Sequence, residues 1–263
     1  FFLAQRPGPS SEGYVLPNGW RISPIGKVIH TEDLILNILP TPDSRAMVAV
    51  HSGFNPHGLV LIDGVTDEAV QQIALPTTWL GLAWHPDGTR LYVSGGNNKS
   101  AEGIRAPIYV FGYAAGRLTE KPIANLMESS EPDQIYWAGL IHHPTKQLLF
   151  AANRTAGNVV VFDTASGQLL RRITTEVNPY DLVLSNDGRT LYCSNWASDS
   201  VSVIDTETFK VSMTIGVGDN PNDMVLSKDG RLFVACSNDN SVVVIDTKQG
   251  RAVQTLITSM HPR

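Results

Sequence analysis

The chain has 263 residues, of which 42% are hydrophobic, and it carries 20 Lys and Arg against 25 Asp and Glu, for a formal net charge of −5. This acidic balance contains no basic run, which argues against a surface that follows nucleic-acid phosphates, so we expect no nucleic-acid partner. No apolar stretch reaches the roughly 18 residues that a membrane-spanning helix needs, so we expect no membrane span.

The N-terminal residues pass from an apolar tip, FFLA, into a stretch rich in Pro, Gly and Ser. We interpret residues 1–12 as a disordered terminus or the remnant of a signal peptide, and residues 13–263 as the folded domain. A signal peptide would make the protein periplasmic or secreted.

One pattern recurs five times after residue 30. Each unit contains an apolar strand, a Pro/Asp/Gly turn, a second strand, a polar loop, a third strand, a short turn and a fourth strand. The units cover about residues 30–75, 76–125, 126–175, 176–216 and 217–258. The two clearest copies begin NPYDLVLSNDGRTLYCSN at Asn178 and NPNDMVLSKDGRLFVACSN at Asn220.

The strand segments are short, rich in Val, Ile, Leu, Tyr and Phe, and bounded by Gly, Pro, Asn and Asp. No segment keeps a helical period. Four antiparallel strands in a unit of forty-odd residues are typical of a propeller blade, which buries its faces against its neighbours. The sequence therefore predicts an all-β fold, a β-propeller with about five four-stranded blades.

Most acidic residues fit turns better than a site. The Asp that ends each third strand is interpreted as a turn former that accepts hydrogen bonds from the backbone two residues ahead, at Asp63, Asp163, Asp205 and Asp246. Cys193 lies six residues after Asp187, whereas Cys236 lies seven after Asp229. That offset predicts that the two sulfurs face opposite sides of their sheets, which argues against a disulfide and favours two small buried side chains.

The segments LYVSGG, LFAAN, LYCSN and LFVACSN, each followed by a strand like SVSVID, resemble the YVTN family of β-propeller repeats over about residues 30–258. The lead-in GYVLPNGWRISPIGKVIH resembles that of exported bacterial proteins in which such a propeller precedes a phosphoesterase domain. The resemblance implies seven blades, so we favour a fragment of a larger propeller over a closed five-bladed ring. Residues 13–23 would then suit the outer strand of a last blade.

Candidate ligand-binding residues lie where the chain enters each first strand, because these strands line the channel of a propeller near its mouth. In the fourth and fifth units these are Asn178, Asp181, Asn220 and Asp223, and in the second and third units the aromatic residues Trp79 and Trp137. Apolar walls with a few polar groups are typical of pockets, so the mouth could hold a protein or a small polar ligand. The alternative is loop capping by Asn and rim packing by Trp.

No metal or cofactor is expected. His142 and His143 are adjacent, so in a strand their rings point to opposite faces, and no Cys or carboxylate joins His51 and His57 at ligand spacing. The chain contains no nucleophile elbow, phosphate-binding glycine loop, zinc motif or CxxCH haem motif.

We therefore expect no catalytic residues and a non-catalytic binding or scaffold module of an exported bacterial protein, and the resemblance implies a neighbouring phosphoesterase domain outside this chain. The alternative is a lactonase-type hydrolase, because the segment IYVFGYAAGRLTEKP resembles a turn between the third and fourth strands of propeller lactonases. The closely spaced channel histidines of that family are not evident. A redox propeller is the least favoured.

Overall fold

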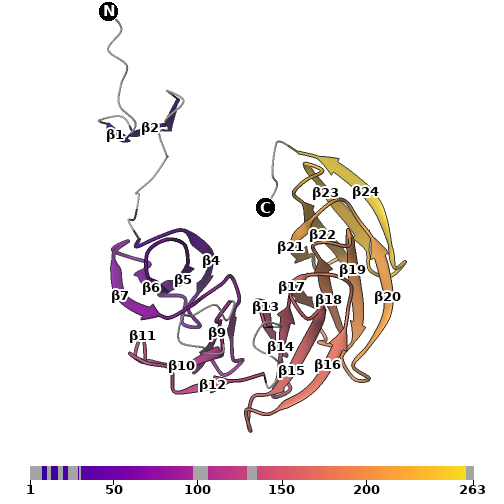
Figure 1. Ribbon diagram of the computed structural model, residues 1–263, viewed down its shortest axis with the longest axis horizontal. Coiled ribbons are helices and arrows are strands. Elements are labelled where there is room, and N and C mark those ends of the chain that lie inside the picture. The colour runs from indigo at the N-terminus through magenta and orange to yellow at the C-terminus, as the bar shows by residue number, and fades with distance from the viewer. Residues whose placement is uncertain are drawn as a thin grey trace, which may run out of the picture.

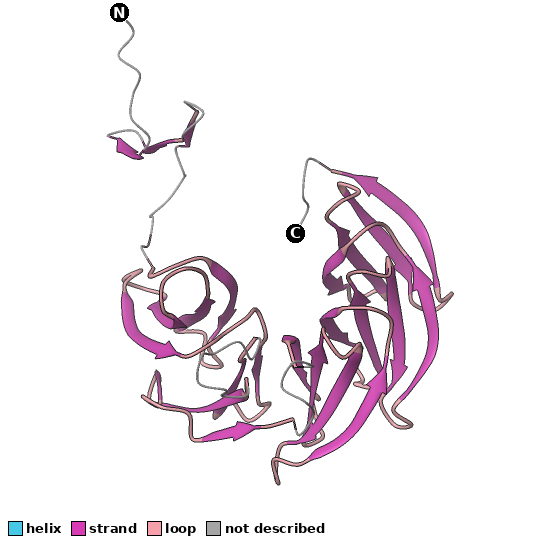
Figure 2. Cartoon of the chain, viewed as in Figure 1, coloured by secondary structure: helices cyan, strands magenta, loops and turns pink. Residues whose placement is uncertain are grey.

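The computed structural model describes residues 8–10, 13–16, 20–22, 29, 31–96, 106–128 and 135–258. Strands, turns and loops make up this part of the chain, which has no helix (Figure 2). The described residues accordingly contain no helix long and apolar enough to cross a membrane. The all-β prediction is confirmed.

Five sheets follow one another around an open arc, each with strands in sequence order (Figure 1). Blade 1 contains β4 (Ile35–Pro40), β5 (Ala46–His51), β6 (His57–Asp63) and β7 (Ala69–Leu75). Blade 2 contains β8 (Leu82–Trp84), β9 (Arg90–Ser94) and β10 (Ile108–Ala114), and its outer edge is split into β11 (Arg117–Leu118) and β12 (Ala124–Leu126).

The last three blades are more regular. Blade 3 contains β13 (Trp137–His142), β14 (Leu148–Asn153), β15 (Asn158–Asp163) and β16 (Leu169–Thr174). Blade 4 contains β17 (Pro179–Leu184), β18 (Thr190–Asn195), β19 (Ser200–Asp205) and β20 (Lys210–Gly216). Blade 5 contains β21 (Pro221–Leu226), β22 (Arg231–Cys236), β23 (Ser241–Asp246) and β24 (Arg251–Ile257). The predicted blade architecture is confirmed.

The turns after the third strands form as the sequence predicts. Asp63 is typical: its Oδ1 accepts hydrogen bonds from the N–H groups of Val65 and Thr66, both at 2.8 Å, and these bonds lower the pKa of its carboxyl group. Asp163, Asp205 and Asp246 make the same pair of bonds in blades 3, 4 and 5. This repeated acidic residue is therefore structural.

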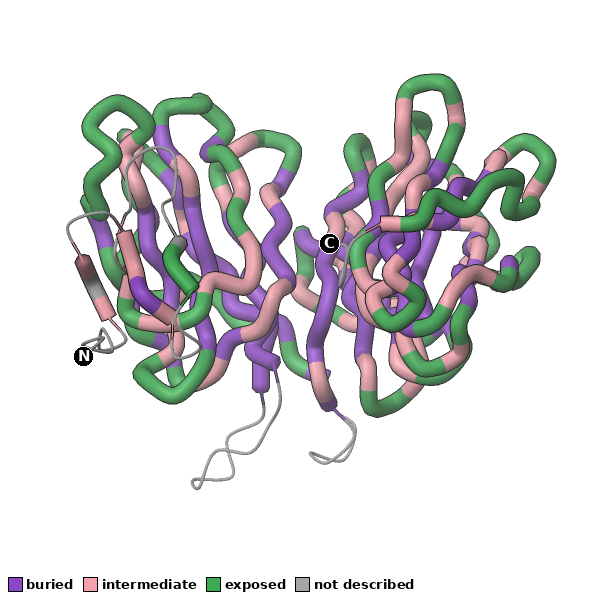
Figure 3. Tube along the Cα trace, turned by 90° about the horizontal axis from the view of Figure 1, so that it is seen from above, coloured by how far each residue is buried: buried purple, intermediate pink, exposed green. Residues whose placement is uncertain are grey.

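The hydrophobic core lies between blades. Leu59 of blade 1 packs in one cluster with Phe111 of blade 2, and Tyr92 of blade 2 in another with Phe162 of blade 3. Two further clusters join blades 3 to 4 and 4 to 5. Figure 3 shows the buried residues concentrated along the strands and the exposed residues at the loops. Since each large apolar side chain buried here contributes about 1.5–3 kcal/mol, adjacent blades stabilise each other.

The prediction for the two cysteines was half right. Both thiols are free and buried, but both face the preceding blade, because Cys193 packs with residues of blade 3 and Cys236 with residues of blade 4. The hairpin turn is one residue shorter in blade 5: Leu191 pairs with Ile204 and Leu232 with Ile245, and these leucines lie four and three residues after their turn aspartates. Cys193 therefore lies two residues after Leu191 and Cys236 four residues after Leu232, and both even spacings place the thiol on the same face as the leucine.

The described residues of the N-terminal segment pair with one another. Its described residues form a separate sheet of β1 (Gly8–Ser10), β2 (Gly13–Val15) and β3 (Arg21–Ile22), in the order β1-β2-β3. Tyr14 pairs with Pro9 on one side and with Ile22 on the other. This sheet lies apart from the arc in Figure 1. The described residues of this segment pair with none of the five blades, and their place as the outer strand of a further blade stays a prediction.

Candidate functional site

The first strand of each blade is innermost and the fourth is outermost, as blades 3 to 5 show clearly in Figure 1. The inner strands carry a repeated irregularity near their start. The pairing register shifts between Ile35 and Asn37, Trp137 and Leu140, Pro179 and Leu182, and Pro221 and Met224. Such bulges redirect a side chain out of the regular alternation. In blades 3, 4 and 5 the residue before the resumed pairing, Gly139, Asp181 or Asp223, is thereby taken out of that alternation. In blade 1 the pairing resumes at Asn37 itself.

Five equivalent positions meet at this level of the channel, one from each blade: Asn37, Gly81, Gly139, Asp181 and Asp223. The two glycines lie against the next blade, because a Cβ at Gly81 would lie 2.2 Å from the Ala138 carbonyl oxygen and one at Gly139 would lie 2.7 Å from that of Tyr180. Blades 2 and 3 therefore contribute backbone here, while blades 1, 4 and 5 contribute polar side chains.

A cavity of about 130 Å³ opens among these polar side chains. It spans the channel, since blade 1 and the entry to blade 2 form one wall and blades 4 and 5 form the other. Its lining residues are Leu36, Asn37, Leu80, Tyr180, Asp181, Asn222 and Asp223. The Asn37 amide donates a hydrogen bond to the Leu80 carbonyl at 2.8 Å, and the Oδ1 atom of Asn222 is buried without a hydrogen-bond partner. The cavity therefore has a free acceptor beside its carboxyl groups.

Asp181 and Asp223 converge on one backbone amide. The Met224 N–H donates to Asp181 Oδ2 at 2.9 Å and to Asp223 Oδ1 at 3.0 Å. The Asp181 N–H donates to Ser194 Oγ at 2.9 Å, which fixes the bulge of β17. Asp181 is half-buried and Asp223 is exposed to the open channel. The two carboxyl groups thus form a pair in which Asp181, the inner carboxyl group, is more buried than Asp223.

This arrangement favours a proton on the inner carboxyl group. Burial, and after it the negative charge of Asp223, together raise the pKa of Asp181 to about 8. The hydrogen bonds from backbone amides act in the opposite direction but are weaker. Two neighbouring carboxyl groups that differ in protonation can supply a general acid and a general base.

A guanidinium group lies close to this pair. Arg154 directly follows β14, and its Cζ lies 5.2 Å, 5.3 Å and 5.5 Å from the ring centroids of Tyr136, Tyr180 and Trp196. Its Nε atom is buried without a hydrogen-bond partner, and none of the ion pairs formed by the described residues includes Arg154. Tyr180, which contacts this cation, also lines the carboxylate cavity.

The sequence did not identify Arg154 or Asn37. Arg154 occupies the loop position held by Trp196 in blade 4 and Ser237 in blade 5. A positively charged residue at only one of these equivalent positions was the feature of the sequence that could have identified it. Asn37 occupies the place of Asp181 in the repeat, but in ILNILP the residues before it do not match NPYD.

The other predicted site residues lie in different surroundings. Asn178 and Asn220 adopt positive φ angles of 56° and 53°, and the Asn220 amide donates to the Trp196 carbonyl at 2.8 Å, so both asparagines form turns. Trp79 is half-buried and contacts Tyr136 edge to face at 5.5 Å. Trp137 is fully buried between blades 2 and 3, where its Nε1 donates to the Ala106 carbonyl. Asp181 and Asp223 are the predicted residues that line the cavity.

The histidines are placed inside the fold. His85 and His142 meet between blades 2 and 3 with their ring centroids 4.5 Å apart, and burial lowers the pKa of His142 to about 4. His142 Nε2 lies 3.1 Å from Thr164 Oγ1, and His85 Nε2 lies 3.0 Å from Gln147 Oε1. Among the described residues, no group of three or more His, Cys, Asp or Glu could hold a metal ion.

Comparisons with known proteins relate the chain to an enzyme family. A family model described as "Lactonase, 7-bladed beta-propeller" matches residues 81–214 and 176–257. The chain is also similar to the crystal structure of a functionally unknown protein from Desulfotomaculum acetoxidans DSM 771, with 19% identity and a TM-score of 0.69 over 87% of this chain and 76% of that one. At this identity the likeness shows the fold alone. No curated protein matches the chain.

The family match corrects the function expected from the sequence. A non-catalytic binding or scaffold module was the favoured interpretation, because the sequence shows no catalytic motif and no closely spaced channel histidines. The match favours the alternative, a lactonase-type hydrolase. The expectation failed because the candidate acid and base lie 42 positions apart in two repeats, where each Asp also fits a loop.

Proposed function

Because the chain belongs to the lactonase, seven-bladed β-propeller family, we propose that it hydrolyses a lactone in the channel cavity lined by Asp181 and Asp223. One observation carries the proposal: two carboxyl groups from adjacent blades accept hydrogen bonds from the same Met224 N–H, and burial favours a proton on Asp181. The Arg154 guanidinium contacts the ring of Tyr180, which lines the same cavity.

Lactone hydrolysis needs a base at the attacking water and an acid at the leaving oxygen. Asp223, which is open to the channel, accepts a proton from water as the water oxygen bonds to the lactone carbonyl carbon. The ring C–O bond then breaks, and Asp181 donates its proton to the departing alkoxide. The product is a hydroxy acid, and proton exchange with solvent restores the pair.

Arg154 supplies positive charge near this step. A guanidinium packed among three aromatic rings loses water while keeping its charge, because the faces of the rings stabilise a cation. With no carboxylate partner among the described residues, this charge can interact with an anionic group of the ligand or with the oxygen that becomes negative in the transition state. We assign Arg154 the role of binding and stabilising this negative charge.

The experiment measures lactone hydrolysis by the purified chain. Acid release is recorded for a set of lactones, with and without a chelator. We expect Asp181→Asn and Asp223→Asn each to lower kcat/KM about 100-fold or more, as is usual when a general acid or base is lost. Arg154→Met should lower it as well. The matched controls are Asp187→Asn and Asp229→Asn, which remove turn carboxylates from the same two blades and should keep the activity.

Two results would count against this function: no lactone in a broad set is hydrolysed, or the activity survives both substitutions in the channel. Circular dichroism and the unfolding midpoint of each variant separate lost chemistry from lost folding. If a chelator abolishes turnover, the hydrolysis needs a metal ion, and the metal-free acid–base scheme is wrong.

We further propose that the repeats are of the YVTN type, as LYCSN and LFVACSN suggest, and that the lead-in GYVLPNGWRISPIGKVIH relates this propeller to those found beside phosphoesterase domains. Both proposals rest on sequence resemblance. An alignment of homologues that share the channel Asp pair would test them, since unrelated lead-in segments in such homologues would contradict the second proposal.

A further inference from the structure

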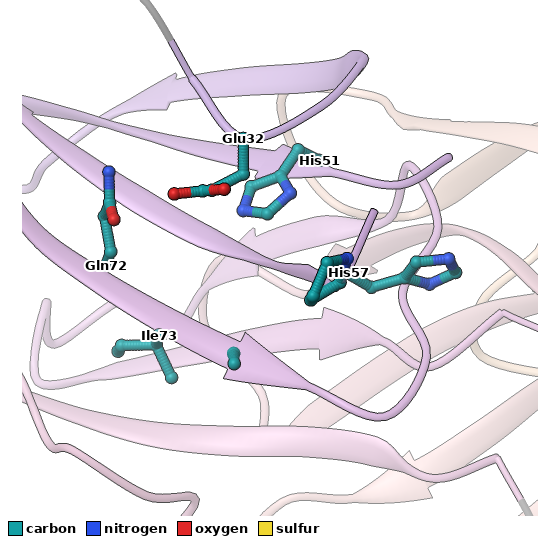
Figure 4. A pocket seen from close by; sticks show the side chains of 7 residues that line it. Glu32, His51, His57, Gln72 and Ile73 are labelled. Carbon is teal, nitrogen blue, oxygen red and sulfur yellow. The ribbon is translucent and has the colours of Figure 1, made fainter. Parts of the chain in front are cut away.

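A second cavity, of about 360 Å³, lies on blade 1, away from the channel pair (Figure 4). Its polar lining consists of Glu32, His51, His57 and Gln72, and its apolar lining of Pro56, Ile73 and Ala74. Ile73 belongs to the cluster that faces blade 2, whereas Gln72 and Ala74 alternate with it and so face the opposite way. Figure 1 shows blade 2 on one side of blade 1 and no blade on the other.

Three side chains of this cavity, those of His51, Glu32 and Gln72, have polar atoms without a hydrogen-bond partner among the described residues. His51 is 3% exposed, and its Nδ1 is buried without a hydrogen-bond partner. Its ring lies over Gly58, where a Cβ would lie 3.1 Å from His51 Nε2. Figure 4 shows the Glu32 carboxyl group beside the His51 ring, and neither this carboxyl group nor the Gln72 amide takes part in a hydrogen bond among the described residues. The cavity therefore presents one negative charge and a buried acceptor.

His57 does not act as a catalytic base here. Its Nδ1 accepts a hydrogen bond from the Thr78 N–H at 3.0 Å, so the neutral ring carries its proton on Nε2. That Nε2–H can donate to Ser52 Oγ, 3.3 Å away, and cannot accept the proton of Ser52. The Ser52–His57 pair is therefore unsuited to nucleophilic catalysis, which leaves binding as the role of this pocket.

Blade 3 shows what fills the equivalent place. Ile73 pairs with Leu59 and Ile173 with Val159, which makes Gln72 and Arg172 equivalent. Arg172 forms an ion pair with Glu128, whose side chain is 1% exposed and which lies in the segment leading into blade 3. Glu32 lies in the segment leading into blade 1. The shorter Gln72 leaves open the space that a guanidinium occupies in blade 3.

We propose that this pocket binds the side chain of an arginine or lysine from a polypeptide segment that packs against blade 1. The Glu32 carboxylate pairs with the cation, His51 Nδ1 accepts one of its hydrogen bonds, and Pro56 and Ala74 contact the methylene stem. A polypeptide is the occupant because the equivalent place in blade 3 is filled by a side chain of the polypeptide itself, Arg172 paired with Glu128, and because none of the five blades covers this face of blade 1 in Figure 1. Other blade junctions also use such pairs, as Lys146 of blade 3 does with Glu207 of blade 4.

The test is a titration of the purified chain with N-acetyl-arginine-N-methylamide. Binding is measured from the changes in backbone ¹⁵N NMR chemical shifts. The corresponding citrulline derivative has the same shape without the charge. We expect selective shifts around His51 and Gln72, with the citrulline derivative binding about tenfold or more weakly, as is usual for a hydrogen bond to a charged group. Agmatine tests for a free small cation: binding of agmatine without binding of the blocked arginine would overturn the polypeptide assignment.

Two variants make the proposal specific. Glu32→Gln should reduce binding of the arginine derivative about tenfold, whereas Glu176→Gln, in the segment leading into blade 4, should leave it unchanged. Gln72→Arg should fill the pocket and abolish binding, whereas Thr255→Arg adds the same charge at the equivalent position of blade 5 and should not. Equal binding of the two derivatives, or no effect of Glu32→Gln, would overturn the proposal.

This test is independent of lactone hydrolysis. The Gln72→Arg and Glu32→Gln variants should keep the hydrolytic activity of the channel, because neither residue lines the channel cavity. A chain without lactonase activity can still pass the binding test, and an active lactonase can fail it. The two proposals can therefore fail separately.

Discussion

The shared proton of the channel pair predicts an unusual dependence of stability on pH. In the unfolded chain Asp181 titrates near 3.8, whereas in the folded protein its pKa is raised to about 8. The folded state therefore holds about one more proton than the unfolded state between these values. A raised pKa means that its contribution is complete below pH 3.8 and is lost as the pH rises toward 8. Stability should fall with increasing pH in this window.

The size of the effect follows from the proton count. One extra proton in the folded state lowers the free energy of unfolding by about 1.4 kcal/mol per pH unit, or about 3 kcal/mol between pH 5 and 7. Both figures are upper values, because the channel side of Asp181 is open to solvent, which screens its charge. Asp181→Asn removes this dependence, so the difference in stability between the variant and the parent chain should grow by this amount from pH 5 to 7.

The assay is urea unfolding of both proteins at pH 5, 6 and 7, with fluorescence and circular dichroism as independent probes. Comparing the two proteins at each pH cancels the titration of all other groups that the substitution leaves unchanged. Asp187→Asn is the control, because its exposed turn carboxyl group should show no such dependence. Parallel stability curves for Asp181→Asn and the parent chain would refute the assignment of a proton to Asp181.

Three further predictions concern residues that support the blades. Burial lowers the pKa of His142 to about 4, so its contribution to stability is present above pH 6.5 and lost as the pH falls toward 4. His142→Gln should therefore lose less stability than the parent chain between pH 6.5 and 4.5, as urea unfolding at both values can measure. Asn220→Ala should cost about 1–2 kcal/mol because φ is 53°, and Asn220→Gly should cost less although it also loses the bond to Trp196, as thermal unfolding can measure. Trp137→Phe leaves the Ala106 carbonyl without its donor and should cost about 1–3 kcal/mol in urea unfolding; an unchanged midpoint would mean that water replaces the indole.

The fold was predictable because repetition reveals it. Short strands bounded by turn residues at regular spacing require neighbouring sheets, and the turn role of Asp63 followed from its position alone. The facing of Cys236 was not predictable by counting from Asp229, because one residue lost in a hairpin turn shifts the register of the whole strand. The shorter hairpin turn can be recognised once the cross-strand pairing partner of Leu232 is known.

The candidate site was half predictable. Asp181 and Asp223 were recognised because they recur in matching segments, but recurrence also selected Asn178 and Asn220, which serve the backbone. Arg154 was missed because its importance depends on three aromatic rings, one that leads into blade 3 and two in blade 4, and no spacing along the sequence brings these together. Repeat matching finds residues that the fold needs everywhere, whereas a site consists of residues that differ between repeats.

The channel shows how a repeated fold acquires one site. Each blade presents an equivalent position, but backbone of the next blade crowds Gly81 and Gly139, whereas Asn37, Asp181 and Asp223 extend polar groups into the same cavity. The architecture is nearly symmetric and the chemistry is not. If the site depends on this asymmetry, moving one carboxyl group to another blade should not preserve the activity. An Asn37→Asp, Asp223→Asn double variant keeps the total charge but separates the general acid from the general base. Its kcat/KM for a lactone should stay at the level of Asp223→Asn alone, and recovery of activity would show that any carboxylate at the channel mouth suffices.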